Sequence, residues 1–490
     1  MASSRALRVR SLGLVLCSTS TVLATGCLED NPIEPTATAG TEDPTAGTSD
    51  TTTAGAEDGL LACASPPCTL LVVSQTLDDR IDVYDVTAAP FLRGRIGTDL
   101  KFDASGEQVM GNLLDEPYGL LLDGDHLWAA IGHYPDTNRG SLLAFPHAAF
   151  ADVAQGEVFA EDKYFGAGKF SAGVLDLPFG RQEAIFLLRH PSGKILVGVF
   201  ANDLRAASWP EPSELLVVDP TDLRSEAIGA FSLDLDTTPC NGGWKIAALD
   251  DAVSRVAFAC DGNDAVAVIS LPGDFAELAP AAAAAGMSAC STPLASGTVT
   301  TQFVAPDGAG GLLAVQSQIL EPPKLWSING NCGIAGAPGD ELPPELDSVR
   351  VVREPVLLRP AGGGQPAMWL LASETPTPGV LIVRGGASPT VCGQVSGLDA
   401  IEAAENAPFA LTLDSTRTHL AIGAGPVSNP PFAEGRGQVL WATLDVAELD
   451  SCAVAATDVV DLTEGTFVAT DPRTWVRAPN MLLIAELGGS

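Results

Sequence analysis

Short apolar segments separated by tight turns recur along the chain from about residue 60 onward. Each unit has an apolar segment, a turn rich in Asp, Gly and Ser, a second apolar segment, a variable loop and a third apolar segment. One copy runs Pro117-Tyr-Gly-Leu-Leu-Leu-Asp-Gly-Asp-His-Leu-Trp-Ala-Ala-Ile131, followed by Ser141-Leu-Leu-Ala-Phe145. Such segments, bounded by turn residues, predict β-strands in a repeat architecture. Only Ala279–Ala285 favours a short helix.

The repeat spacing predicts the fold. The second segments return on average about 59 residues apart, which suits a four-stranded propeller blade with long loops. Candidate innermost strands begin near residues 117, 183, 244, 300, 354, 407 and 471. A third-strand segment near residue 80 precedes the first innermost strand, so the last innermost strand should complete the first blade. We therefore predict an all-β chain, a β-propeller of seven four-stranded blades closed by N- and C-terminal strands, with eight blades as the alternative.

Two groups of segments resemble the repeat of YVTN/lactonase-like propellers. They are Leu70-Leu-Val-Val-Ser74 with Arg80-Ile-Asp-Val-Tyr-Asp85, and Pro117-Tyr-Gly119 with Leu122-Asp-Gly-Asp-His-Leu-Trp128. The resemblance is degenerate and covers about 400 residues of a repeat architecture. It implies the propeller fold, and it implies little about activity because propellers host many functions.

The N-terminus carries an export signal. Three arginines precede Ser11–Ala24, an apolar and small stretch that is too short to cross a bilayer. The sequence that follows, Leu23-Ala-Thr-Gly-Cys27, resembles the bacterial lipoprotein signal, in which Cys27 becomes a lipidated N-terminus. The family prefers Leu three residues before the Cys, where this chain has Ala24. Ordinary secretory cleavage near Gly26 is the alternative.

The resemblance to lipoproteins sets the expected domains and location. Residues 1–26 are the signal peptide, residues 27–59 the lipidated Cys27 with a disordered acidic Thr/Ala/Gly tether, and residues 60–490 the propeller domain. Leu28, in place of the Asp that marks inner-membrane retention in some lipoproteins, favours the outer membrane or cell surface. A flexible chain of this length reaches about 30 Å, so the tether holds a folded body clear of a lipid surface.

The charge narrows the classes of partner. The chain has 61 acidic and 26 basic residues, a net charge of −35. Cleavage after residue 26 removes three arginines and leaves 23 basic against 61 acidic residues, a net charge of −38. Residues 28–59 hold eight of these acids, so the globular body keeps a net charge of about −30. This balance excludes a nucleic-acid binder and electrostatic docking on anionic lipid, so the lipid is the only expected membrane contact.

Cysteines also point to export. Eight remain beyond Cys17 and Cys27, and an even number in an exported chain predicts disulfides. Spacing makes Cys63–Cys68 and Cys240–Cys260 the natural local pairs. Cys332, Cys392 and Cys452 are separated by 60 residues each, so we expect equivalent positions in successive blades, too far apart to bond through regular strands; loop excursions are the alternative that would allow a bond. Zinc is disfavoured because no Cys-x-x-Cys pair occurs.

Catalytic signals are sparse. No HExxH, GxSxG, Walker A or EF-hand pattern occurs. His126, His190 and His419 fall at equivalent turns and indicate a structural repeat, and the tryptophans at 128, 326, 369 and 441 indicate packing between blades. Three Asp-rich fragments can bind Ca²⁺ through hard oxygens but are more simply turns: Asp123-Gly-Asp125, Asp234-Leu-Asp236 and Asp261-Gly-Asn-Asp264. No other cofactor is expected.

The loops carry the candidate binding residues. In a propeller, the connections between second and third strands, and between blades, emerge on one face, and binding sites concentrate on such loops. The longest of them carry aromatic and cationic residues in a chain poor in both: His133, Tyr134, Arg139, Arg205, Trp209, Phe432 and Arg436. Tolerated loop insertion is the alternative explanation. We predict a lipid-anchored binding module for an unknown protein or glycan, and the alternative is a metal-dependent propeller hydrolase or lactonase.

Overall fold

The computed structural model describes most of the segments between residues 61 and 488. The described residues are 61, 63, 66–76, 80–98, 114–123, 126–134, 141–146, 158–159, 174–176, 184–200, 212–220, 229–235, 238–275, 289–294, 300–318, 321–339, 349, 351–375, 378–426, 436–464 and 479–488. The signal, Cys27, the tether and the expected helix at Ala279–Ala285 lie outside them.

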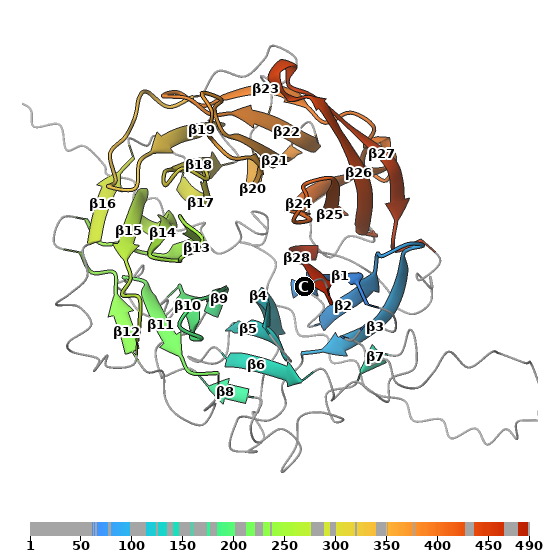
Figure 1. The fold of residues 1–490 in the computed structure, drawn as a ribbon, viewed down its shortest axis with the longest axis horizontal. Coiled ribbons are helices and arrows are strands. Elements are labelled where there is room, and N and C mark those ends of the chain that lie inside the picture. Colours follow the sequence, from blue (N-terminus) through green and yellow to red (C-terminus); the bar gives the residue numbers. More distant parts are fainter. Residues whose placement is uncertain are drawn as a thin grey trace, which may run out of the picture. The chain divides into compact units, whose positions relative to one another are not determined.

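Seven small sheets follow one another around a central axis and form a seven-bladed β-propeller (Figure 1). We number the blades 1 to 6 in chain order, call the closing blade 7, and give each blade's strands from the axis outward. Blade 1 contains β4 (Leu114–Asp123), β5 (His126–Tyr134), β6 (Ser141–Pro146) and β8 (Val174–Asp176). Blade 2 contains β9 (Ala184–Arg189), β10 (Ile195–Val199), β11 (Glu214–Val218) and β12 (Gly229–Ser232). Blade 3 contains β13 (Gly243–Ala248), β14 (Arg255–Cys260), β15 (Ala265–Ser270) and β16 (Ala289–Pro293).

The second half of the ring repeats the pattern with one irregular blade. Blade 4 contains β17 (Thr300–Pro306), β18 (Leu312–Gln318) and β19 (Glu321–Ile328), and isolated bridges from Ile334 and Gly339 to β19 stand where a fourth strand is expected. Blade 5 contains β20 (Val351–Arg359), β21 (Met368–Thr375), β22 (Gly379–Arg384) and β23 (Thr390–Gln394). Blade 6 follows the short helix α1 (Asp399–Ala403) and contains β24 (Asn406–Leu413), β25 (His419–Pro426), β26 (Gln438–Glu448) and β27 (Ala453–Asp461).

Blade 7 joins the two ends of the chain. Its innermost strand is β28 (Pro479–Leu487), which pairs antiparallel with β1 (Cys68–Gln75), followed outward by β2 (Arg80–Asp85) and β3 (Phe91–Gly97). The two-residue strand β7 (Val158–Phe159), between β6 and β8 in sequence, adds in parallel to the outer edge of β3. The expected closure by terminal strands is confirmed, and the eight-blade alternative is wrong because β1 and β28 are neighbours in one sheet.

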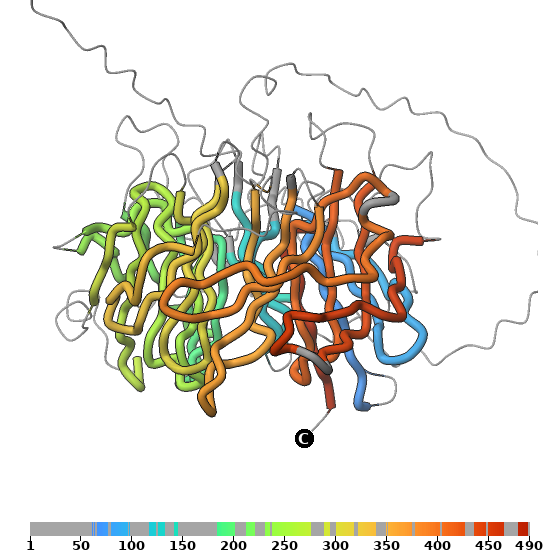
Figure 2. The backbone as a smooth tube through the Cα atoms, turned by 90° about the horizontal axis from the view of Figure 1, so that it is seen from above, coloured from blue at the N-terminus to red at the C-terminus, as the bar shows by residue number. Residues whose placement is uncertain are grey.

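The two faces of the ring are distinguished by which ends of the strands lie on them. We call the upper face the one that holds the beginnings of innermost strands and the ends of second strands, and the lower face the opposite one. Figure 2 shows the lower face at the bottom of the ring, with the C-terminus. Cys68 at the start of β1 pairs with Leu487 at the end of β28, and Cys63 lies against the carbonyl of Leu487. The chain therefore enters the propeller on the lower face.

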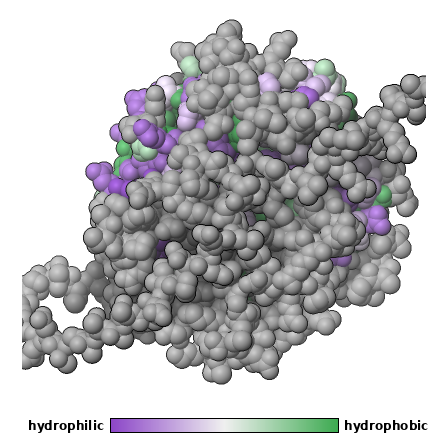
Figure 3. Space-filling view, turned by 180° about the vertical axis from the view of Figure 1, so that it is seen from behind, coloured by the Kyte–Doolittle hydropathy of each residue, from purple (hydrophilic) through white to green (hydrophobic). Residues whose placement is uncertain are grey.

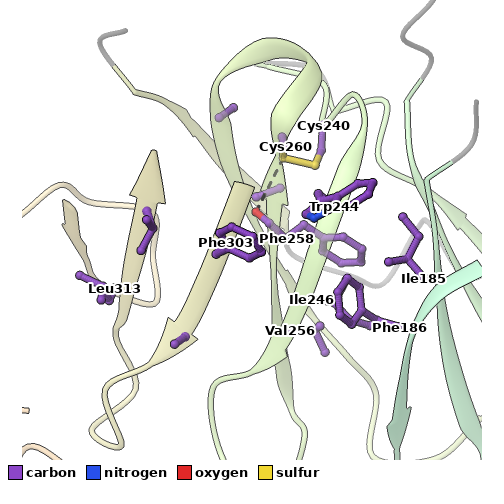
Figure 4. Packing of buried hydrophobic residues seen from close by; sticks show 14 of the residues in the cluster. Ile185, Phe186, Cys240, Trp244, Ile246, Val256, Phe258, Cys260, Phe303 and Leu313 are labelled. Atoms are coloured by element: carbon purple, nitrogen blue, oxygen red, sulfur yellow. Dashed lines mark hydrogen bonds between the residues drawn. A yellow bond between two sulfur atoms is a disulfide. The ribbon is translucent and has the colours of Figure 1, made fainter. Parts of the chain in front are cut away.

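The core lies in the seams between blades. Second strands such as Ile195–Val199 are buried along their whole length, because both faces of each blade are covered by neighbouring blades. One continuous cluster spans blades 2 to 5, and Figure 4 shows its centre, from Phe186 through Trp244 and Phe258 to Phe303. The four expected tryptophans are buried in these seams, and Nε1 of Trp369 donates to the carbonyl of Pro306 in blade 4 at 2.9 Å.

All eight cysteines of the described region are paired. Cys63–Cys68 and Cys240–Cys260 are the expected local bridges. Cys290–Cys332 joins blade 3 to blade 4, and Cys392–Cys452 joins blade 5 to blade 6.

Cys332 bonds to neither Cys392 nor Cys452, but the expectation that Cys392 and Cys452 are equivalent is wrong, and these two form a bond through a turn. Cys392 lies on the outer strand β23, whereas Cys332 and Cys452 lie in turns that follow the third strands, with φ of 59° and 58°. Each turn reaches back to the outer strand of the preceding blade, and the Cα atoms of Cys392 and Cys452 are 5.9 Å apart. Nearby, Ser396 bridges to Ala455 in β27, so the outer rims of blades 5 and 6 touch.

Among the described residues, no helix is both long and apolar enough to cross a membrane.

Candidate binding site on the propeller axis

The structure describes only some of the loop residues that the sequence predicts to bind a ligand. Arg139, Arg205, Trp209 and Phe432 lie outside the described residues. His133 and Tyr134 end β5, with their backbones paired to Asp115 and Leu114, so they lie on the upper face. The strand ends that flank residues 201–211, at Phe200 and Pro212, belong to the same face.

Arg436 is part of the scaffold of blade 6. Its guanidinium donates to the hydroxyl of Thr463 at 2.9 Å and lies 3.9 Å from the carboxylate of Asp461, and its carbonyl accepts from the amide of Asn406. Gln438 also donates to Asp461, at 3.1 Å. These contacts tie the start of the innermost strand to the end of the outermost one, so Arg436 holds the upper end of its own blade together.

Charged side chains that were not predicted from the sequence lie on the innermost strands. Lys245 on β13 of blade 3 forms an ion pair with Glu354 on β20 of blade 5. These blades are not neighbours, because β17 of blade 4 lies between them. The pair therefore passes on the axial side of β17. Both side chains are mostly buried, with 12% and 21% of their surface exposed.

One aromatic ring lies against this ion pair, and others pack around the residue before Lys245. Nζ of Lys245 lies 4.1 Å from the ring centre of Phe186 on β9, a cation–π contact. Trp244, the residue before Lys245, packs edge-on against Phe200 at 5.6 Å and against Tyr118 at 6.3 Å between ring centres. The inner strands of blades 1, 2 and 3 thus bring Lys245 close to three aromatic side chains, which are Tyr118, Phe186 and Trp244.

A second charged pair continues the set into blades 5 and 6. Arg353, the residue before Glu354, binds the carboxylate of Glu374 at 2.9 Å, and both are largely buried. The Arg353 guanidinium also lies 5.3 Å from the ring of Phe409 on β24. We name Phe186, Lys245, Arg353, Glu354, Glu374 and Phe409 the axial cluster. All except Glu374 come from innermost strands, and all belong to the upper half of the ring.

The axial cluster combines two ion pairs with two aromatic rings. The ion pairs hold their charges in fixed places, and each cation lies over one of the rings. The sequence analysis missed it because Lys245 and Arg353 stand in strand segments, whereas all the predicted binding residues came from loops. The available signal was their scarcity: the whole chain has 26 lysines and arginines.

The three histidines predicted to be structural have ring partners or turn contacts. His419 stacks on Trp441 with ring centres 5.2 Å apart, and its Nδ1 lies 3.0 Å from the carboxylate of Asp414. His126 lies against Trp128 at 5.8 Å. His190 meets Phe275 edge-on at 4.6 Å and pairs with the hydroxyl of Ser192. All three stand at turns between first and second strands.

The Asp-rich fragments have different surroundings. Asp123 pairs with Arg189 at 2.9 Å, Asp234 is exposed, and Asp261 is buried; Asp125 and Asp236 lie outside the described residues. Across the residues the structure describes, no three His, Cys, Asp or Glu side chains gather as a set that could hold a metal ion.

The described surface shows no large apolar patch. Its exposed large hydrophobic residues are Phe91, Ile334 and Val460, which come from three different blades. Figure 3 shows the molecule from behind Figure 1, on the side of the upper face, and the described residues visible there mix hydrophilic and hydrophobic types.

Comparisons with known proteins return propellers at low similarity. No protein-family model matches the chain, and no curated protein matches it. A putative 6-phosphogluconolactonase from Bacteroides fragilis aligns with 8% identity and a TM-score of 0.49, over 86% of this chain and 98% of that one. The periplasmic gluconolactonase of Pseudomonas aeruginosa aligns with 12% identity and a TM-score of 0.47, over 86% and 99%. The seven-bladed assignment rests on the strand pairing, not on these neighbours.

Proposed function

We propose that this chain is an exported, lipid-anchored β-propeller that binds a protein or glycan of the cell envelope through its upper face. The lipoprotein-like signal ending at Cys27 and the acidic tether supply the attachment. Paired cysteines fit an oxidising compartment outside the cytosol.

The observation that carries the proposal is the position of the chain's entrance. The tether precedes Leu61, which is fully buried, and Cys63, which is bonded to Cys68 at the lower end of β1. An attachment at the lower face favours presentation of the upper face to the surroundings. The axial cluster and the end of β5, with His133 and Tyr134, belong to that upper face.

The axial cluster supports the class of ligand. An incoming hydroxyl, amide or carboxylate can exchange hydrogen bonds with the partly exposed atoms of Lys245 and Glu354, while the half-buried ring of Phe409 beside Arg353 adds an apolar surface. Hydroxyl-rich sugars and mixed polar and apolar peptide segments share this chemistry. A strongly cationic partner gains further from the acidic body of the propeller.

The test is capture of envelope components with matched variants of the full chain. Lys245→Met removes the axial cation and keeps the aliphatic stem, whereas Arg359→Met removes a similar cation at the lower end of β20, where Arg359 pairs with Asp450 at 2.9 Å. We expect wild type and Arg359→Met to retain the same partner from crosslinked envelopes, and Lys245→Met to lose at least tenfold of it.

Equal capture by all three proteins would contradict the upper-face site. Attachment is tested separately, by incorporation of labelled palmitate: Cys27→Ser should abolish labelling, and persistent labelling would overturn the anchor. The folded state of each variant is checked by its far-ultraviolet circular dichroism.

A further inference from the structure

Asp261 is a buried carboxylate whose two oxygens lack any hydrogen bond that meets normal geometry. It begins the 3₁₀ turn Asp261–Asn263, which follows β14 at the upper face, and only 2% of its surface is exposed. Within the part of the chain that the structure describes, neither Oδ1 nor Oδ2 has a hydrogen-bond partner at normal distance and angle. A buried ionised group of this kind is costly unless something neutralises it.

The side chains near Asp261 are two neutral polar groups and a second acid. Its own backbone N–H donates to the carbonyl of Gly242, which fixes the turn against β13. Burial raises the pKa of the Asp261 carboxyl to about 7; the side chains of Thr300 and Gln302 on β17, which lie close enough to hydrogen-bond to it, lower this pKa, and the charge of Asp264 raises it. Among the described residues, no cation is one of the groups that shift this pKa.

Asp264 closes the turn from the other side. Its backbone is left-handed, with φ of 54°, and its Oδ1 accepts the backbone N–H of Thr301 at 3.1 Å. The turn therefore joins blade 3 to the beginning of the innermost strand of blade 4. Asp261 and Asp264 bring two negative charges to this joint, next to the neutral oxygens of Thr300 and Gln302.

We propose that Asp261, Asp264, Thr300 and Gln302 form a calcium site at the upper joint between blades 3 and 4. The Asp261 carboxylate is the central ligand, the side-chain oxygens of Thr300 and Gln302 are neutral ligands, and Asp264 adds charge. An all-oxygen set of this kind suits a hard cation of flexible coordination, whereas zinc selects nitrogen and sulfur. With only two carboxylates, the expected dissociation constant is about 0.1–1 mM, as for calcium modules outside cells.

Calcium binding is measured on the full chain, first stripped with a chelator, by calorimetric titration in about 0.15 M salt, which screens diffuse binding to the acidic body. Wild type should bind one Ca²⁺ in the stated range. Asp261→Asn should weaken this binding at least tenfold. Asp234→Asn, which removes an exposed aspartate from another Asp-rich fragment, should leave it unchanged.

A second variant separates the loss of a calcium ligand from the loss of charge or of the folded state. Gln302→Leu removes a neutral ligand without changing the charge and should weaken calcium binding several-fold. Calcium at a saturating concentration should raise the melting temperature of wild type by about 1–2 °C and should not raise that of Asp261→Asn. Equal calcium binding by wild type and Asp261→Asn, or no binding by either, would overturn the site.

Discussion

Lys245 of blade 3 and Glu354 of blade 5 form an ion pair across the axial side of blade 4. Their strands are separated in the ring by β17, so the contact ties together two blades that share no seam. Lys245 also lies over the ring of Phe186 in blade 2. One side chain therefore connects blades 2, 3 and 5 at the axis.

Removing one member of this pair should destabilise the ring. Lys245→Met leaves Glu354 largely buried without its partner, and we expect a loss of about 2 kcal/mol in the free energy of unfolding, between the values of exposed and buried pairs. The double variant Lys245→Met/Glu354→Gln should recover part of that loss. The measurement is denaturant unfolding, with Arg359→Met as the control, which should cost under about 1 kcal/mol. A loss in Lys245→Met no larger than in the control would contradict the buried pair.

The disulfides should differ in their contributions according to the loops they close. Cys392–Cys452 closes 60 residues and Cys63–Cys68 closes only 5. Loop-closure entropy assigns about 4 kcal/mol to the first and about 2 kcal/mol to the second. Paired Cys→Ser variants, compared by denaturant unfolding under oxidising conditions, measure both. The opposite order would show that chain entropy is not the main contribution.

Acid should weaken the turn that holds His419. Burial alone would raise the pKa of Asp414, but hydrogen bonds from the hydroxyl of Thr416, from His419 and from the backbone of Thr418 outweigh it and hold the pKa below its ordinary value. A lowered carboxylate pKa contributes stability above the unfolded pKa, near 3.8, and this contribution is lost as pH falls through the folded pKa.

The pH prediction is tested with one variant. The melting temperature of wild type, followed from pH 6 to pH 2, should fall more steeply below pH 4 than that of Asp414→Asn, which lacks the titrating group. Parallel curves for the two proteins would mean that Asp414 contributes nothing to acid sensitivity.

The closing strand should be essential to the ring. Deletion of residues 479–490 removes β28 and exposes the edge of β1, which pairs with β28 from Cys68 to Gln75. We expect the truncated chain to lose most of its cooperative thermal transition, because an open propeller has an unpaired inner edge. Deletion of residues 488–490 alone is the control and should leave the transition in place. An unchanged melting temperature in the longer deletion would contradict closure by β28.

The repeat pattern of the sequence was sufficient to predict the ring. Six of the seven expected innermost strands begin within about three residues of their observed positions, because strand segments and turn residues alternate at a regular spacing. The missing fourth strand of blade 4 and the added strand β7 were not predictable. Strand β7 pairs with β3, a segment distant in sequence, which local patterns do not record. At the edge of blade 4, isolated bridges to β19 replace a regular strand.

The wrong expectation about Cys392 and the missed axial cluster have a common cause. Equal spacing suggested that Cys392 and Cys452 were equivalent. Cys392 lies on a strand and Cys452 in a left-handed turn, so equal spacing did not mean equal position in the blade. Likewise, Lys245 and Glu354 are 109 residues apart, and only ring closure brings them together. Arg436, chosen for its loop position, is held by Thr463 and Asp461 of its own blade.

The proposed function is tested most directly by photo-crosslinking at two phenylalanines. A benzophenone amino acid at position 409 places the reactive group in the axial cluster, and the same substitution at Phe91, which is 42% exposed at the lower start of β3, is the matched control. After irradiation of intact cells, we expect a crosslinked envelope component from position 409 and none from position 91. Crosslinks from position 91 alone, or the absence of crosslinks from position 409, would contradict binding at the upper face.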